Sequence, residues 1–157
     1  VAMVRAAALV HDVGKVAIGE ALLGRPDALA RQDLEALRDH AVLGATIVEA
    51  VLAPEQARWV RHHHEHWDGN GYPDRLVGSA IPDGATIIAV ADAWDAMTSD
   101  RPGVPARDPA EALHECIHGA GGRFAPGPVD ALIQLWREGV LADWHRPALG
   151  DVYRPAA

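Results

Sequence analysis

This sequence of 157 residues has a single cysteine, no long hydrophobic run and no excess of positive charge. Because Cys116 is the only cysteine, no internal disulfide can form, and nothing in the composition indicates an oxidising compartment. No apolar run approaches the roughly 18 residues that suggest a membrane-spanning helix. With 14 basic and 22 acidic residues the net charge is −8, which argues against a general binder of nucleic acid polymers or anionic membranes.

An initiator methionine and a basic-then-apolar signal segment are also missing. The first ten residues have the composition of the middle of a buried helix, so we expect the natural chain to extend upstream. A sensor or regulatory domain is expected there, in a cytoplasmic protein. Hydrophobic residues make up 49% and charged residues 23%, which is the composition of one globular domain.

A helical hydrophobic pattern runs through nearly the whole sequence and predicts an all-α fold. The stretch over 2–11 is apolar almost all round, so we expect this helix to be central. Asp108, followed by Pro109 and Glu111, has the pattern of a helix N-cap, and Gly139 ends the last helix. Helices are predicted over residues 2–11, 31–39, 41–52, 54 to about 66, 83–97, from 108 onward, and 126–138.

Histidine and aspartate gather in four short segments. Imidazole and carboxylate without a nearby thiolate suit divalent iron, manganese, nickel or zinc better than an oxygen-only magnesium or calcium site. An aspartate directly after a histidine can bridge two ions, and converging helical sites repeat the design of dinuclear bundle proteins. Asp92 lies in an apolar stretch, where a carboxylate is costly unless it is paired or bound to metal. The segments are HDVGK at 11–15, DHAVLG at 39–44, RHHHEHWDGNGYP at 61–73 and AVADAWDAMTSDR at 89–101.

These segments, taken in this order, resemble the HD-GYP family of the HD phosphohydrolase superfamily, from about Arg5 to Gly139. The resemblance implies an HD-domain helical bundle whose core holds a His/Asp centre of two or three divalent ions, iron or manganese first. Its best-known members hydrolyse the bacterial second messenger cyclic di-GMP. A metal-dependent phosphodiesterase that forms linear pGpG or GMP is therefore implied, and a homodimer is compatible with it. The implied domain covers residues 1–139 without the family's first helices, and 140–157 form a C-terminal tail.

The resemblance also assigns the metal ligands. His11 and Asp12 match the defining pair, with Asp12 as the bridging ligand. The residues alone leave His62, His63 and His64 open as ligands, and the preference for the last two comes from the resemblance. We then expect His62, like His66, to lie behind the ligands or face solvent. The implied ligand set is His11, Asp12, His40, His63, His64 and Asp92.

Other positions are expected to serve the reaction or the substrate. Lys15 is placed to contact a phosphate oxygen or the leaving group, so Lys15 and Asp12 are the expected catalytic residues. Arg101 matches a family arginine that faces the substrate phosphates, and Asp95 lies on nearly the same helical face as Asp92. In the loop over 68–73, Gly69 and Gly71 would let the backbone approach a ligand closely, and Tyr72 offers the face of its ring to a guanine. The expected substrate-binding residues are Gly69, Gly71, Tyr72, Pro73, Asp95 and Arg101.

Each of these residues also has an ordinary structural use. A single buried aspartate often caps a helix, a core histidine is usually only hydrogen-bonded, and Lys15 could be an exposed surface lysine. The loop could simply cross between helices, and Asp95 could pair on a helix surface. His114 and His118, spaced i, i+4 outside the family's ligand set, are interpreted as a solvated helix surface.

Three features depart from the family pattern. After Arg101 the family has a proline, an aromatic and a basic residue, whereas 102–105 read Pro-Gly-Val-Pro and remove a stacking or phosphate contact. The family's first helices, which supply further metal ligands, are absent. Phe-Ala-Pro at 124–126 replaces Phe-Asp-Pro and indicates the loss of a helix cap. The first two departures favour an alternative, a regulatory or nucleotide-sensing module without turnover. A third alternative is hydrolysis of another cyclic nucleotide or phosphoester.

Overall fold

The computed structural model describes residues 1–18, 31–101 and 103–141. This part is helical, and it contains two isolated β-bridges but no strand, which confirms the predicted all-α class. None of the described helices is long and apolar enough to cross a bilayer. The elements are α1 (Ala2–Val10), η1 (Val13–Ala17), α3 (Arg31–Arg38), α4 (His40–Val48), α5 (Pro54–His62), η2 (Gly78–Ala80), α6 (Asp83–Thr98), α7 (Pro109–His118) and α8 (Pro126–Arg137).

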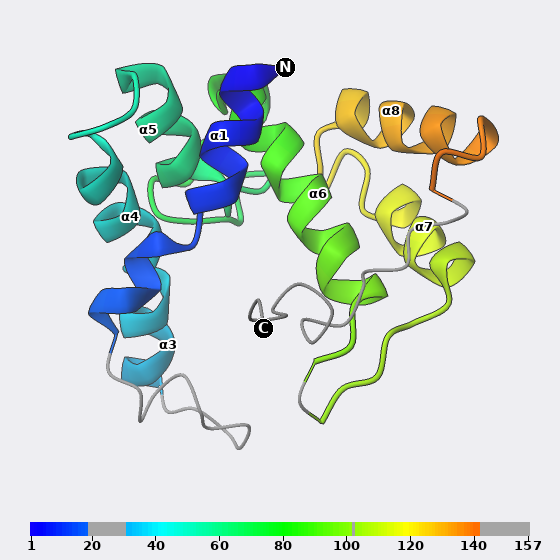
Figure 1. Ribbon diagram of the computed structural model, residues 1–157, viewed down its shortest axis with the longest axis horizontal. Helices are drawn as coiled ribbons and strands as arrows, with labels where there is room; N and C mark the ends of the chain where they lie inside the picture. The colour runs from blue at the N-terminus through cyan, green and yellow to red at the C-terminus, as the bar shows by residue number, and fades with distance from the viewer. Residues whose placement is uncertain (19–30, 102, 142–157) are drawn as a thin grey trace, which may run out of the picture.

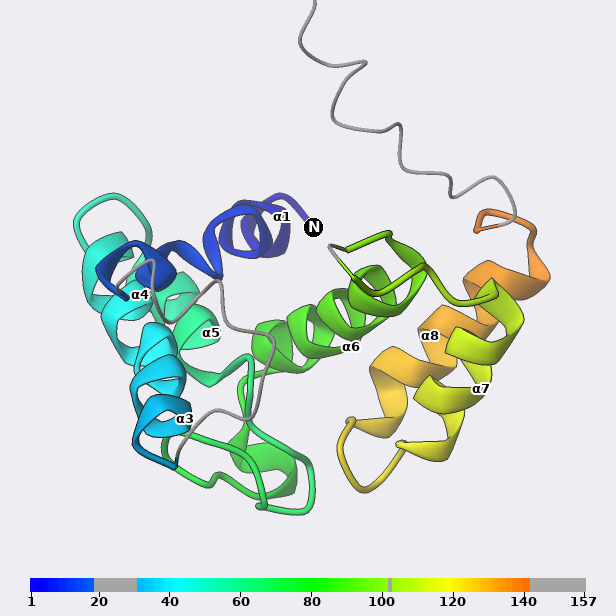
Figure 2. The same ribbon diagram turned by 90° about the horizontal axis from the view of Figure 1, so that it is seen from below.

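Helix α6 lies between two groups of helices and belongs to both hydrophobic cores. Figures 1 and 2 show α1 and α3–α5 on one side of α6 and the α7–α8 pair on the other. The first half of α6 packs Ala85 and Ile88 into a core with α1 and α5. Its second half packs Val90 and Trp94 into a core with α7 and α8. Asp92 therefore lies in the second half of α6, between Val90 and Trp94 of the core with α7 and α8.

A close contact between α5 and α6 sets how these helices cross. Trp59 of α5 is buried, and its indole ring lies over Gly84 in the first turn of α6. A Cβ atom at Gly84 would stand 2.2 Å from Trp59 Cδ2, so only glycine allows the indole to lie there. The contact fixes the end of α5, where the histidine segment follows, relative to α6.

Local cap signals are confirmed. The Asp108 side chain accepts a hydrogen bond from the Ala110 N–H and caps α7. The N-cap of α8 is Ala125, which makes no side-chain cap bond, as the loss of aspartate from the Phe-Asp-Pro pattern predicted. A side-chain cap involves residues only two positions apart, as Asp108 and Ala110 show, which is why the sequence alone indicated both the cap and its loss.

Three predictions about the helices were wrong. The helix expected over 41–52 is α4, which begins at His40 and ends at Val48. Helix α5 ends at His62 instead of near 66, because the chain turns back so that Glu65 can accept backbone hydrogen bonds from the following loop. Helix α1 is not central in the described part of the chain, since Leu9 is 76% exposed and its buried residue is Ala7. An apolar composition on all sides of a helix does not tell which sides neighbours cover. The predicted tail over 140–157 lies outside the described residues beyond Leu141.

Replacing Gly84 by alanine tests the Trp59 contact. The Gly84→Ala variant should lose about 1–3 kcal/mol of unfolding free energy, because the added methyl group displaces a rigid buried ring. Gly127→Ala is the matched control, since Gly127 is also the second residue of a helix and its Cβ would meet no atom within 4 Å. The control should keep or gain up to about 1 kcal/mol. Equal urea denaturation midpoints for the two variants would contradict the packing described here.

Candidate metal centre

The site begins where the chain leaves α1 and packs against α4. A Cβ atom at Gly14 would lie 2.0 Å from the His40 carbonyl oxygen and 2.5 Å from the Gly44 nitrogen. The absence of a side chain at Gly14 thus allows backbone to touch backbone. This contact brings His11 and Asp12, just before Gly14, within reach of His40.

Three histidines are oriented in the same way at the ends of three helices. In each, ring Nδ1 lies at hydrogen-bond distance from the carbonyl three residues earlier: His11 to Ala8 (2.7 Å), His40 to Leu37 (2.5 Å) and His63 to Val60 (2.6 Å). These carbonyls belong to the last turns of α1, α3 and α5, where the helix itself leaves carbonyls without partners. A neutral ring that donates from Nδ1–H keeps the lone pair of Nε2 available for a metal.

One group of ligand atoms comes from Asp12, His40, His63 and His64. One nitrogen or carboxylate oxygen from each of the four lies within 4.8 Å of the others. His40 Nε2 lies 3.3 Å from Asp12 Oδ1 and 3.2 Å from His64 Nε2. Two imidazole lone pairs at this distance repel each other unless a proton or a cation lies between them. The four residues can therefore hold one divalent ion.

A second group shares Asp12 with the first. His11 Nε2 lies 3.5 Å from Asp12 Oδ2 and 3.6 Å from Asp92 Oδ1 on α6. The two oxygens of Asp12 thus face different histidines, Oδ1 toward His40 and Oδ2 toward His11. This is the arrangement that a carboxylate needs to bridge two ions.

The protonation states of His63, His64 and the two carboxylates suit metal binding near neutral pH. Burial alone would lower the pKa of His11, but its contacts with Asp92, the Ala8 carbonyl and Asp12 outweigh burial and raise the pKa. Burial lowers the pKa of His63 to about 4, and burial with the neighbouring imidazoles His63 and His40 lowers the pKa of His64 to about 3. Burial alone would raise the pKa of Asp12, but its contacts with His40 and Lys15 outweigh burial and hold the pKa well below its usual value. The pKa of Asp92 is likewise lowered, because its interaction with His11 outweighs burial. Neutral imidazoles and ionised carboxylates are the forms that bind divalent cations.

Unsatisfied buried atoms give an independent test of the fit. Among the described residues, five buried side-chain atoms lack a hydrogen-bond partner. Two of them, His62 Nδ1 and Trp94 Nε1, lie outside the cluster, and the other three are His11 Nε2, Asp12 Oδ1 and His63 Nε2. Each such atom costs about 1–3 kcal/mol if nothing binds it. All three belong to the two ligand groups, and a metal ion would satisfy them.

Lys15 lies at the edge of this cluster. Its Nζ is 2.5 Å from Asp12 Oδ2, and 42% of its side chain is exposed. The ammonium therefore contacts a candidate metal ligand and also reaches solvent. It is not an isolated surface lysine.

The loop after His64 is anchored by a buried carboxylate. Glu65 is 3% exposed and accepts hydrogen bonds from the backbone N–H groups of Asp74 (2.7 Å) and Leu76 (3.1 Å). Outside this anchor, Asp74 pairs with Arg61 and with His62 Nε2 at 2.9 Å. Glu65 and Asp74 were missed by the sequence reasoning, since hydrogen bonds across a loop leave no periodic pattern. His62, expected behind the ligands or in solvent, is buried and pairs with this second carboxylate.

Tyr72 joins the loop to the metal cluster. Its N–H donates to the His64 carbonyl at 3.2 Å, and its ring stacks on the His64 imidazole with centroids 4.9 Å apart. Arg38 lies over the Tyr72 ring, 5.2 Å from the centroid. At Gly71 the missing Cβ makes room for the backbone of Glu65 and His66, because an added Cβ would lie 2.2 Å from the His66 nitrogen. The loop therefore approaches its own chain there.

The remaining predicted residues lie at different distances from the cluster. Asp95 lines a cavity of about 370 Å³ between α1 and α6 together with His11 and Asp92, and it accepts a hydrogen bond from Ser99. Arg101 is exposed in a turn after α6, and no contact among the described residues joins it to the cluster. Gly69, with a φ of 83°, and Pro73 line a second cavity beside Tyr72. His66 is half-buried, whereas His114 and His118 are exposed on α7, as predicted.

Comparisons with known proteins agree with this arrangement. The HD domain family matches residues 1–127. A cyclic di-GMP phosphodiesterase of Thermotoga maritima is 34% identical over 151 residues, which cover 94% of this chain and 38% of that protein. The cyclic di-GMP phosphodiesterase response regulator RpfG of Xanthomonas campestris is 38% identical over 85% of this chain and 36% of its own length. A 3′3′-cGAMP-specific phosphodiesterase of Vibrio cholerae is 34% identical, covering 87% of this chain and 27% of that protein.

A solved structure shows the same fold. The crystal structure of a cyclic GMP-AMP specific phosphodiesterase of Vibrio cholerae superimposes with a TM-score of 0.67 at 19% identity, over 89% of this chain and 39% of that one. The chain thus spans between about a quarter and two fifths of the length of these proteins. A helical bundle with a His/Asp centre, matched over most of its length, defines an HD-type domain. The chain belongs to the HD-GYP family of HD domains.

Removing Asp12 tests the shared carboxylate. The Asp12→Ala variant should lose bound divalent metal, because both ligand groups use this residue. Elemental analysis of anaerobically purified protein measures the ions per chain. His114→Ala is the control, since it removes an exposed imidazole from α7 and should leave the metal content unchanged. An Asp12→Ala protein that retains as much metal as the control would rule out the arrangement.

Replacing Glu65 tests the loop anchor. Glu65→Gln keeps one acceptor oxygen but turns an amide NH₂ toward the second backbone N–H. The free energy of unfolding should fall by about 1–3 kcal/mol, because that N–H loses its acceptor. Hydrogen exchange at the amides of Asp74 and Leu76 should accelerate. Glu49→Gln, at the exposed C-cap position directly after α4, should change neither the stability nor the exchange at these amides. Unaltered exchange at both amides in Glu65→Gln would show that the carboxylate does not hold the loop.

Proposed function

We propose that this chain is a metal-dependent phosphodiesterase that hydrolyses cyclic di-GMP to linear pGpG or GMP in bacterial signal transduction. The observation that carries the proposal is the position of Asp12 between two groups of ligand atoms. The similar proteins with this activity in their names support the choice of substrate class. The proposed ligand set is His11, Asp12, His40, His63, His64 and Asp92. The proposed location is the cytoplasm.

Two divalent cations bound to these residues, with iron or manganese as the candidates, would supply an activated water and bind the phosphate oxygens. The histidines contribute by geometry, because hydrogen bonds from Nδ1 to helix carbonyls hold their rings and fix the direction of Nε2. A third ion, the regulatory domain and the homodimer expected from the sequence stay predictions, as does the assignment of 1–139 as the domain.

Lys15 is proposed to stabilise the negative charge that develops on the substrate during the reaction. Lys15 is the single lysine among the 14 basic residues of the sequence, and the others are arginines. A compact ammonium group therefore occurs at this position alone. Its contact with Asp12 places Nζ beside the bridging carboxylate, and its partial exposure lets it reach a phosphate oxygen from the solvent side. There it would stabilise charge that develops on the phosphoryl group or the leaving oxygen.

The proposed substrate contacts divide into two sides of the centre. Gly69, Gly71, Tyr72 and Pro73 belong to the loop that packs on His64. Asp95 faces the cavity that also contains His11 and Asp92, and Arg101 follows at the end of the same helix. A second candidate substrate is 3′3′-cGAMP, because the similar Vibrio cholerae protein is specific for it.

The decisive experiment measures metal content and cyclic di-GMP turnover on the same sample. About two ions per chain with formation of pGpG or GMP is the expected result. Metal without turnover of any cyclic dinucleotide would refute the proposal and favour the regulatory module.

The same assay tests Lys15. Lys15→Met should lower kcat by about 10²-fold while the metal content stays unchanged, because one donor to the developing charge is lost. Arg58→Met removes an exposed positive charge from α5 and should retain full activity. A Lys15→Met enzyme with unchanged kcat would exclude Lys15 from the chemistry.

A further inference from the structure

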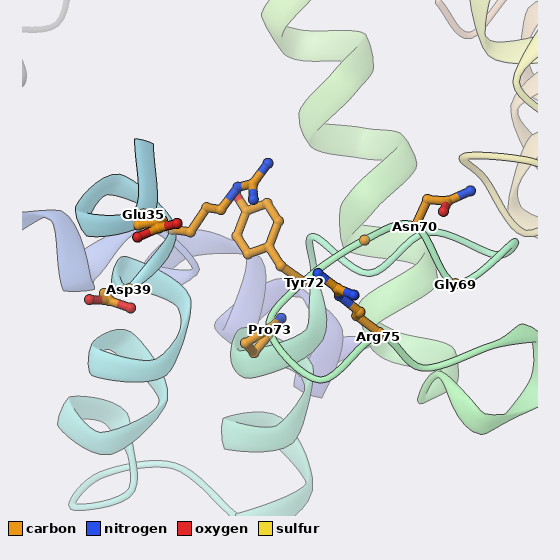
Figure 3. A pocket seen from close by; sticks show the side chains of 9 residues that line it. Glu35, Asp39, Gly69, Asn70, Tyr72, Pro73 and Arg75 are labelled. Atoms are coloured by element: carbon orange, nitrogen blue, oxygen red, sulfur yellow. The ribbon is translucent and has the colours of Figure 1, made fainter. Parts of the chain in front are cut away.

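A cavity of about 450 Å³ lies between the loop of Tyr72 and the corner where α3 meets α4. Its volume is within the range of about 300–1,000 Å³ that is typical of small-molecule pockets. Figure 3 shows Glu35 and Asp39 on the helix side and Pro73 and Arg75 on the loop side, with the Tyr72 ring between them. Arg38, Gly69, Asn70 and Gly71 complete the lining.

The cavity shares a wall with the metal centre. Tyr72 stacks on His64 and also lines the cavity, and Asp39 directly precedes His40 in the chain. His64 and His40 both belong to the four-residue ligand group. A phosphodiester held at this group would therefore have its attached nucleoside next to the cavity.

The helix side of the lining carries the carboxylates of Glu35 and Asp39 and the guanidinium of Arg38, which lies over the Tyr72 ring, and the loop side carries Arg75. Carboxylates of Glu35 and Asp39 can accept hydrogen bonds, and the Arg75 guanidinium can only donate. Guanine has the complementary pattern, with donors at N1–H and N2–H₂ on one edge and acceptors at O6 and N7 on the other. An arginine fork to O6 and N7 is the commonest specific contact to guanine.

Adenine lacks this complementarity. It has an N6–H₂ donor where guanine has O6, which would face the guanidinium of Arg75. It has no N1–H or N2–H₂ to donate to Asp39. The lining therefore favours guanine over adenine at both edges of the base.

We propose that this cavity is a guanine-specific subsite, with Asp39 and Glu35 accepting from the Watson–Crick edge and Arg75 donating to O6 and N7. Tyr72 and Arg38 form the platform beside which the base lies. The inference rests on the proposed function, since it names which nucleoside of the cyclic dinucleotide the domain selects next to the metal centre. It adds Glu35, Asp39 and Arg75 as residues that determine specificity, of which Asp39 alone lies in one of the four motif segments.

Binding of GMP and AMP to the metal-loaded chain tests the subsite without turnover. Calorimetry should show GMP bound at least about 10-fold more tightly than AMP, which is the discrimination expected of one well-formed bidentate contact. The double variant Glu35→Gln with Asp39→Asn should reduce this preference to about two-fold or less, because amides no longer select for donors. Arg75→Met should reduce it as well.

Glu49→Gln is the matched control, since it neutralises an exposed acid directly after α4 and outside this cavity. It should keep the full preference for GMP. Equal affinities for GMP and AMP in the unaltered chain, or a preference that survives both the double variant and Arg75→Met, would overturn the subsite.

Turnover of cyclic di-GMP and of bis(p-nitrophenyl) phosphate, which has no base, separates this inference from the proposed function. A preference for GMP without hydrolysis of either diester supports the subsite and refutes the phosphodiesterase. Hydrolysis of both diesters without a preference for GMP refutes the subsite alone. A chain that neither prefers GMP nor hydrolyses either diester refutes the subsite and the phosphodiesterase together.

Discussion

The contact of backbone with backbone at Gly14 is the constraint on which the rest of the site depends. Any side chain there would collide with the carbonyl of His40 and the nitrogen of Gly44. Without this approach the end of α1 and the start of α4 would separate, and Asp12 could not lie 3.3 Å from His40. A glycine three positions after His11 is thus as much a part of the centre as the groups that carry lone pairs.

The centre concentrates polar atoms in a place that would be unfavourable for them alone. Four imidazoles and two carboxylates, carried by three helix ends and the middle of α6, are removed from water together, and several of their atoms lack protein partners. Burial then favours neutral rings, while mutual interactions favour ionised carboxylates. The same packing that makes the apo site costly selects the protonation states that a dication requires.

How much the sequence could predict depends on the range of each interaction. Asp108 and Ala125 act within a few residues, and the order of the four motifs pointed to residues that the fold does bring together, from His11 to Asp92. Glu65 was missed, because its two hydrogen bonds cross a loop whose path depends on tertiary structure. The exposed side of α1 was also missed, because the apolar composition of a helix does not show which of its residues are buried by neighbouring elements.

The histidine rings at the ends of α1, α3 and α5 serve two partners at once. Through Nδ1 each satisfies a carbonyl that its helix cannot, and through Nε2 it faces the ligand cluster. Metal coordination at Nε2 makes Nδ1–H a stronger donor. Metal binding therefore strengthens the three hydrogen bonds that satisfy carbonyls at the helix ends, so binding and helix stability are coupled. The melting temperature of this domain then depends on the free metal concentration. The free energy of unfolding rises by about 2.7 kcal/mol when that concentration reaches 100 times the dissociation constant. A low supply of free metal would therefore lower the stability of the folded domain as well as the occupancy of its ligand cluster.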